Sequence, residues 1–157
     1  MPPLPLWKLD ELAMEAIELA ARGRTAPNPM VGAIVVSLAG EILGRGWHRA
    51  TGQPHAEIEA LHDARAAGRD VTGAVMVVSL EPCNHHGRTP PCTDAIVEAG
   101  IRHVHIALRD PNPIAAGGLE RLQRAGISVT TTGAAVREAA ARQNEDFVRW
   151  VMSGRIR

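Results

Sequence analysis

The stretch AVMVVSLEPCNHHGRTPPCTDAIVEAG, residues 74–100, contains the clearest indications of both the fold and the chemistry of this chain. Its opening run (74–80) is continuously apolar, which predicts a strand buried on both faces of a sheet. Its closing part (93–100) has a helical pattern and ends at a glycine. Between them lie the chain's only two cysteines, Cys83 and Cys92, in a loop with two histidines and an arginine. This order of strand, polar loop and helix is typical of a parallel α/β unit.

Strand and helix patterns continue on both sides of this segment. Helices are expected at 8–22, 55–68, 119–126 and 134–151, and further strands at 31–37, 41–48, 102–108 and 127–131. The first two strands flank a turn at Ala39 and Gly40, which predicts an antiparallel hairpin. Because helices separate the strands from residue 74 onward, those strands should pair in parallel. The expected fold class is α/β, a three-layer α/β/α arrangement with a mixed sheet of about five strands and helices on both faces.

Composition argues against several classes of function. The formal net charge is zero, and the chain has one phenylalanine, three tryptophans and no tyrosine. Neither a basic footprint nor an aromatic stacking platform is indicated, so no nucleic-acid partner is expected. No run approaches the roughly 20 apolar residues of a membrane span, and the first residues lack the pattern of a secretory signal. We therefore expect a cytoplasmic protein without a membrane partner, in which a disulfide between the cysteines is disfavoured.

The two cysteines need a third partner if they bind a metal; otherwise they are inert thiols. Of the seven histidines, His55 is the best candidate, because it lies with Glu57 in the sequence PHAE at an expected helix start. Cys92 lies in a similar place, where Thr89 could cap the helix and free backbone N–H groups favour a thiolate. One imidazole and two thiolates leave a tetrahedral zinc with one open position, as in catalytic sites. Glu57, about 200° around the helix from His55, would serve that position as a proton acceptor.

A set of motifs in register extends this hypothesis over nearly the whole chain. The motifs are APNPMVGAIVV (26–36), GRGWHRATGQPHAEIEAL (44–61), VSLEPCNHHGRTPPCTDAIVEAGI (78–101) and LRDPNP (108–113). Together they resemble the deaminase domain of the bifunctional deaminase/reductase enzymes of riboflavin biosynthesis, in the cytidine deaminase-like superfamily. His-x-Glu followed by Pro-Cys and a second Cys is the signature of zinc nucleobase deaminases, usually with two residues between the cysteines. The long separation of Cys83 and Cys92 is the feature that resembles the riboflavin enzymes.

The resemblance implies one zinc per chain, bound by His55, Cys83 and Cys92, with Glu57 as the proton shuttle. It places six further residues in the substrate pocket: Asn28, His48, His85, Arg88, Asp110 and Asn112. The implied reaction converts 2,5-diamino-6-ribosylamino-4(3H)-pyrimidinone 5′-phosphate to 5-amino-6-ribosylamino-2,4-pyrimidinedione 5′-phosphate and ammonia. An arginine at position 88 would offer the phosphate a forked, charge-assisted grip.

Four of the pocket residues also have a structural interpretation. Asp110 and Asn112 flank Pro111 where a strand should end, and Asp and Asn often only make turns there. The position favours function, because α/β sheets bind ligands beyond the carboxyl ends of their strands. Asn28, between two prolines, has the same ambiguity, and Arg88 could be a solvated loop charge.

Other polar residues are interpreted as structural. His62 lies on a polar helix face and should be solvated. His103 and His105 alternate on a strand, so their common face should pack against a helix. Glu81 is expected to hold the turn before Cys83.

The chain departs from the family pattern in two places. The segment IAAGGL (114–119) is one residue shorter than the family's glycine loop, and the sequence ends where the family continues into a reductase domain. We therefore expect a single zinc-dependent pyrimidine deaminase domain over residues 1–157, which is either a naturally separate protein or a domain cut from a longer bifunctional one. We expect it to form a homodimer and to work with a separate reductase. Two alternatives remain: a deaminase of the same fold acting on another base, nucleoside or specialised-metabolite pyrimidine, and a non-catalytic zinc-binding partner. Glu57 argues against the second, because a structural zinc site does not need this carboxylate.

Overall fold

One mixed sheet of five strands organises the computed structural model, which describes residues 2–87, 89–113 and 115–153. The helices are α1 (Leu6–Ala20), α2 (Ala56–Ala66), α3 (Cys92–Glu98), α4 (Gly118–Arg124), α5 (Ala134–Gln143) and α6 (Glu145–Met152). The strands are β1 (Gly32–Val36), β2 (Ile42–Trp47), β3 (Val75–Val78), β4 (His103–Ile106) and β5 (Ser128–Thr131). The strand order is β2-β1-β3-β4-β5. β1 is antiparallel to both β2 and β3, whereas β3, β4 and β5 run parallel, which confirms the expected mixed sheet.

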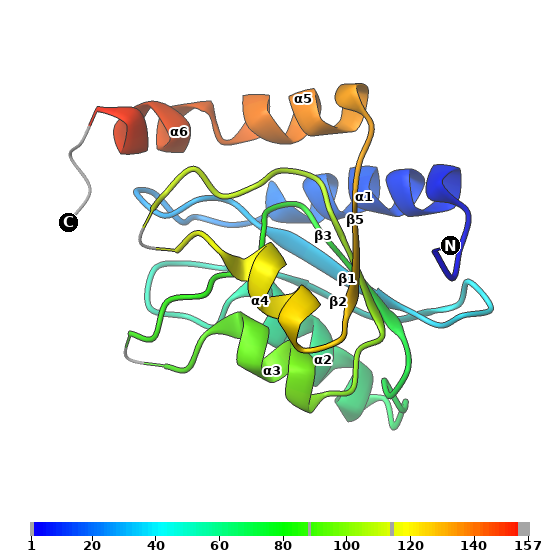
Figure 1. Ribbon diagram of the computed structural model, residues 1–157. Helices are drawn as coiled ribbons and strands as arrows, with labels where there is room; N and C mark the ends of the chain where they lie inside the picture. The colour runs from blue at the N-terminus through cyan, green and yellow to red at the C-terminus, as the bar shows by residue number, and fades with distance from the viewer. Residues whose placement is uncertain (1, 88, 114, 154–157) are drawn as a thin grey trace.

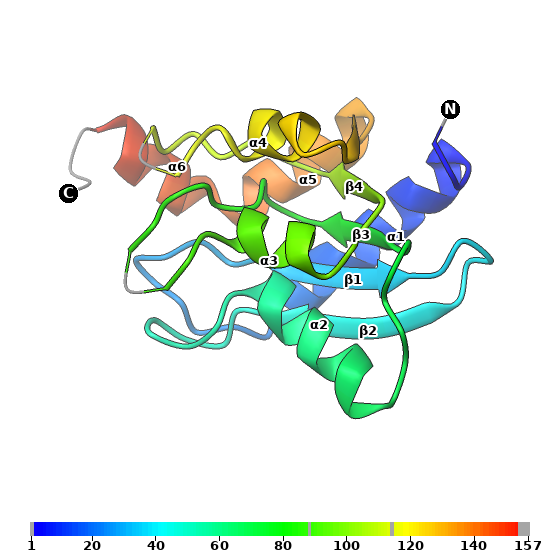
Figure 2. The same ribbon diagram turned by 60° about the horizontal axis from the view of Figure 1, so that its bottom comes forward.

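Helices cover both faces of the sheet, as Figures 1 and 2 show. Because strand side chains alternate between faces, Ile34 and Val36 of β1 join the core under α1 and α5. Ala33 and Val35 of the same strand join the core under α2, α3 and α4. All four residues of the central strand β3 are buried, which explains its continuous apolar run. The expected three-layer architecture is confirmed.

Two glycines bring helix α2 unusually close to the edge strand β2. A Cβ atom on Gly44 would lie 2.3 Å from the Ala60 carbonyl oxygen, and one on Gly46 would lie 2.3 Å from the Ala60 nitrogen. Any larger residue would therefore force the helix off the strand. This close packing fixes the position of the α2 N-terminus, where His55 and Glu57 lie.

The one error in the expected elements concerns the end of the chain. A single helix was expected at 134–151, but the structure has two helices, which meet at Asn144. The buried Asn144 side chain accepts the Met30 N–H (2.8 Å) and donates to the Met30 carbonyl (2.8 Å). The break between the helices lets the Asn144 side chain form these hydrogen bonds with Met30. Helical periodicity does not predict such a long-range contact. The other elements match their expected ends to within two residues.

The two strand histidines pack against a helix, as expected. His103 and His105 are buried on the face of β4 that lies under α1. One ring nitrogen of each is hydrogen-bonded to the Thr130 hydroxyl (2.7 and 2.6 Å), and the other nitrogen of His105 is bonded to Asp10 of α1 (2.8 Å). His62 is exposed, also as expected. Within the described parts of the chain, no helix has both the length and the apolar character to cross a membrane.

Candidate metal centre

The structure brings together His55, Cys83 and Cys92 from three separate segments. The His55 Nδ1 atom lies 3.2 Å from the Cys92 sulfur and 3.7 Å from the Cys83 sulfur. All three candidate ligand atoms lie within 4.8 Å of one another. His55 immediately precedes α2, Cys92 is the first residue of α3, and the two helices lie side by side (Figure 2). Nitrogen and sulfur donors at this spacing fit a zinc ion.

Cys83 reaches this cluster by pairing with the start of α3. Its sulfur accepts the Cys92 backbone N–H (3.4 Å), and its carbonyl oxygen accepts the Thr93 N–H (3.4 Å). The expected cap at Thr89 is wrong: Pro91 is the N-cap residue, and no side chain of the cap bonds to the helix. Instead, the Cys83 sulfur accepts the N–H of the first helical residue, because the loop folds back on the start of α3.

The three candidate ligand side chains shift one another's pKa values. A hydrogen bond from the Cys92 thiol, aided by His55, lowers the pKa of Cys83 to about 4. The same bond to Cys83, together with burial, raises the pKa of Cys92. The hydrogen bond to Cys83 raises the pKa of His55 to about 9. Of the two thiols, Cys83 therefore loses its proton more readily, chiefly because the Cys92 thiol is hydrogen-bonded to its sulfur.

Glu57 lies beside the cluster but outside the group of candidate ligands. It is in the first turn of α2, and only 3% of its surface is exposed. Burial raises the pKa of Glu57 to about 7, and the positive charge of His55 opposes this shift. A carboxyl group with a near-neutral pKa can both accept and return a proton at physiological pH.

A cavity of about 370 Å³ opens beside the cluster. This volume falls within the roughly 300–1,000 Å³ of small-molecule sites. Five of the six predicted pocket residues line it: Asn28, His48, His85, Asp110 and Asn112. His55, Glu57 and Cys83 line it as well. Arg88, the sixth, lies outside the described residues.

His48 presents a hydrogen-bond acceptor to this cavity. It is 3% exposed, and its Nδ1 lies 3.1 Å from the Pro54 carbonyl oxygen, to which it must donate. Burial lowers the pKa of His48, so the ring is neutral and its Nε2 carries a lone pair. This buried Nε2 has no hydrogen-bond partner among the described residues. The ring also packs edge-on against His55, with centroids 5.2 Å apart.

The loop after β4 is both a turn and part of the cavity wall. The Asp110 carboxylate accepts the Asn112 N–H (2.9 Å), as the structural interpretation predicted. Burial nevertheless raises the pKa of Asp110 to about 6, and both side chains line the cavity. Buried Glu81 holds this loop by accepting the N–H groups of Asp110 (3.0 Å) and Leu119 (2.8 Å). The sequence predicted that Glu81 holds the turn before Cys83. In the structure its carboxylate holds the loop after β4 instead, and it also lines the cavity.

The cavity residues that the sequence argument missed include two large aromatic side chains, Phe147 and Trp150 of α6. Their spacing of three residues puts them on one helix face. They belong to a chain with only one phenylalanine and three tryptophans. The scarcity of aromatic residues could have drawn attention to these two. Nothing in the local sequence of α6, however, indicates which part of the molecule this helix face contacts.

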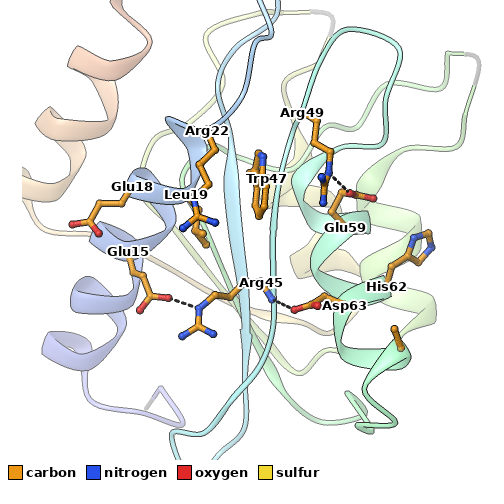
Figure 3. Close-up of a pocket in the computed structure, with 11 residues that line it drawn as sticks. Glu15, Glu18, Leu19, Arg22, Arg45, Trp47, Arg49, Glu59, His62 and Asp63 are labelled. Atoms are coloured by element: carbon orange, nitrogen blue, oxygen red, sulfur yellow. Dashed lines mark hydrogen bonds and ion pairs between the residues drawn. The ribbon is translucent and has the colours of Figure 1, made fainter.

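A larger groove of about 830 Å³ crosses strand β2 between α1 and α2 (Figure 3). Its charged groups are largely paired with each other. Arg45 bonds to Glu15 (2.7 Å) and Arg49 to Glu59 (3.0 Å), while the Arg45 backbone N–H bonds to Asp63 (2.8 Å). None of the predicted site residues is among the described residues that line it. The groove is therefore not the metal centre.

Comparison with known proteins agrees with this site. Residues 7–108 match the family described as "Cytidine and deoxycytidylate deaminase zinc-binding region". The chain is 47% identical over 144 residues to the chloroplastic riboflavin biosynthesis protein PYRD of Arabidopsis thaliana, covering 90% of this chain and 32% of the relative. It is 54% identical over 125 residues to the riboflavin biosynthesis protein RibD of Escherichia coli, covering 77% and 33%.

A solved structure shares the fold along almost the entire chain. This is a diaminohydroxyphosphoribosylaminopyrimidine deaminase/5-amino-6-(5-phosphoribosylamino)uracil reductase from Thermotoga maritima, with a TM-score of 0.89 and 43% identity. The match covers 94% of this chain and 42% of that one, so the chain spans less than half the length of these relatives. The cofactor of the matched region is zinc, which the His-Cys-Cys group fits. The chain belongs to the cytidine and deoxycytidylate deaminase family, whose zinc-binding region it carries.

Proposed function

We propose that this chain catalyses the zinc-dependent hydrolytic deamination of 2,5-diamino-6-ribosylamino-4(3H)-pyrimidinone 5′-phosphate in riboflavin biosynthesis. The products are 5-amino-6-ribosylamino-2,4-pyrimidinedione 5′-phosphate and ammonia. One observation carries the proposal: a buried Glu57 with a near-neutral pKa lies beside a His-Cys-Cys cluster that opens on a substrate-sized cavity. The names of the most similar relatives support the choice of pathway.

In this proposal His55, Cys83 and Cys92 hold the zinc ion. When bound, zinc supplies a Lewis acid that makes water a nucleophile near neutral pH. Glu57 accepts a proton from the attacking water and passes it to the ring nitrogen next to C2. Glu57 then takes the second proton from the hydroxyl group added at C2 and delivers it to the amine. The C2–N bond breaks, the C2 carbonyl forms, and the amine leaves as ammonia. The pKa of Glu57, about 7, suits a group that must both accept and donate.

The remaining cavity residues would bind and orient the substrate. The neutral His48 offers an acceptor, at Nε2, for an N–H of the pyrimidine. Asp110, Asn112 and Asn28 line the same cavity and supply further acceptors and donors for its amino and carbonyl groups. We assign the phosphate to Arg88 and the exposed His85 on the cysteine loop.

Two alternatives are distinguished by one assay. A deaminase for another base or nucleoside would release ammonia from a different substrate, and a non-catalytic zinc protein would release none. We expect ammonia from the pyrimidine phosphate, little from cytidine or guanine, and loss of activity when a chelator removes the metal. Equal rates on cytidine would contradict the proposed substrate. The absence of release from all three by zinc-loaded protein would favour the non-catalytic alternative.

We further propose that residues 1–157 act as one deaminase domain that forms a homodimer in the cytoplasm and passes its product to a reductase. The name of the Thermotoga maritima relative, which joins deaminase and reductase activities, supports this last step. Light scattering of the purified chain should give twice the mass of 16.8 kDa. Adding a pyrimidine reductase with its nicotinamide cofactor should consume the product.

A further inference from the structure

Helix α6 contributes an aromatic surface to the cavity of the metal centre. Phe147 and Trp150 line that cavity together with His55 and Glu57. The same two side chains also line a second cavity of about 620 Å³ between α6 and residues 23–30. Together with Asn28, which also lines both cavities, they form the boundary between the two. Figure 1 shows α6 (red) at the end of the molecule toward which the loops after β3 and β4 run.

Helix α6, which carries both aromatic side chains, is anchored near each of its ends. Val151, on the same side of α6, is buried, whereas Arg149 and Glu145 form an exposed ion pair (2.6 Å). At the start of the helix, Asn144 is joined by two hydrogen bonds to Met30. Met30 lies within the segment Asn28–Val31, most of which lines the cavity of the metal centre. Asn144 thus joins α6 directly to another wall of that cavity.

We propose that Phe147 and Trp150 form an apolar cover that packs against the bound pyrimidine nucleotide, and that Asn144 is the positioning residue that sets this cover. The inference rests on the proposed function and adds specificity residues to it. A pyrimidine has a polar edge and two apolar faces. The polar cavity residues would form hydrogen bonds with the edge of the pyrimidine. The aromatic cover would pack against one of its faces and exclude water. Excluding water strengthens the hydrogen bonds inside the site.

The first test truncates the cover. Phe147→Ala and Trp150→Ala would each join the two cavities and remove a large apolar contact. We expect kcat/KM for the pyrimidine phosphate to fall about 10- to 100-fold, mainly through a higher KM. Zinc content should stay the same. Trp7→Ala is the matched control, because Trp7 is 68% exposed at the start of α1 and should leave both constants unchanged.

The second test separates positioning from stability. Asn144→Ala removes both bonds to Met30, whereas Gln143→Ala removes a bond to the Ile17 carbonyl (2.7 Å) that ties the same turn to α1. Both variants should melt at a lower temperature. Only Asn144→Ala should raise KM, by about the same factor as the cover variants. If both variants raise KM in proportion to their loss of stability, Asn144 has no positioning role.

The last test reads binding without turnover. Tryptophan fluorescence of the Glu57→Gln protein is titrated with the pyrimidine phosphate and with cytidine 5′-monophosphate. We expect a ligand-induced change that Trp150→Phe abolishes and Trp47→Phe preserves, because Trp47 lies in the groove across β2. A change that survives in Trp150→Phe, or cover variants within about twofold of the parent KM, would overturn the inference while leaving the deaminase proposal intact. Ligand binding with the expected change but no ammonia release by the parent would overturn only the deaminase proposal.

Discussion

Glu57 and Glu59 lie two residues apart on the same helix, yet they belong to two very different hollows of the molecule. Glu59 lines the large groove across β2, where Arg49 neutralises it at 3.0 Å (Figure 3). Glu57 lines the smaller cavity, is almost fully buried, and has a pKa raised to about 7. The larger hollow therefore holds charges that satisfy one another. The smaller cavity contains groups that can gain or lose protons near neutral pH. Shifted pKa values, rather than cavity volume, therefore identify the functional site.

The largest effect should come from removing the cysteines. The double variant Cys83→Ser/Cys92→Ser replaces two soft thiolates with hydroxyls, which are poor zinc ligands. We expect zinc to fall from about one per chain to background, and ammonia release to fall with it. Elemental analysis of the purified protein measures this directly. Full zinc content in the double variant would show that the metal lies elsewhere.

Next in size is the contrast between the two glutamates. Glu57→Gln keeps the shape of the side chain but cannot carry a proton, so turnover should fall about 10²- to 10⁴-fold while zinc is retained. Glu59→Gln is the matched control in the groove and should stay within about threefold of the parent. Steady-state ammonia release compares the two variants. Similar rates for both would mean that burial of Glu57 does not mark a catalytic group.

Arg88 provides a smaller effect that depends on the substrate. Loss of a charge-assisted phosphate contact should cost about 1.5 to 3 kcal/mol. Arg88→Ala should then lower kcat/KM for the phosphorylated pyrimidine by about one to two decades. The dephosphorylated riboside, already a poor substrate, should hardly change. An unchanged ratio between the two substrates would exclude Arg88 from phosphate binding.

The pH dependence of zinc binding sharpens the account of the cavity. The pKa of His55 is raised to about 9 and that of Cys92 is also raised, so both hold protons at neutral pH that zinc must displace. Lower pH favours the protonated ligands, and the zinc affinity should fall about tenfold per pH unit for each proton displaced. Competition with a fluorescent chelator at about pH 6 and about pH 8 measures this slope. A flat profile would show that the ligands bind without losing protons.

The smallest expected effect concerns His103, which lies outside both cavities. It tests whether burial alone shifts a pKa value. Burial lowers the pKa of His103 to about 4. The unfolded chain therefore binds this proton more readily than the folded one, and stability should be lost as the pH falls from about 6.5 toward 4. His103→Gln, which keeps a donor toward Thr130, should flatten this part of the curve of melting temperature against pH. His62→Gln, at an exposed position, should leave it unchanged.

Local patterns sufficed for most of the elements and for the cluster of ligands. Alternation and helical spacing are properties of neighbouring residues, so they predicted all five strands and the ends of most helices to within two residues. The spacing from His55 to Glu57 predicted a proton carrier outside the ligand set, and Glu57 lies outside it. The resemblance to known deaminases predicted five described residues that do line one cavity.

What the sequence could not determine depends on contacts between distant segments. The break at Asn144 and the aromatic cover behind it follow from a pairing with Met30, 114 residues away. The pKa of Cys83 is lowered because the folded loop brings its sulfur within hydrogen-bond distance of the Cys92 thiol. The pKa of Glu57 is raised to about 7 because the fold buries it beside His55, Cys83 and Cys92, which come from three separate segments. Residue types and spacings select the groups that can do chemistry, but burial and proton positions are set by neighbours that only the folded chain supplies.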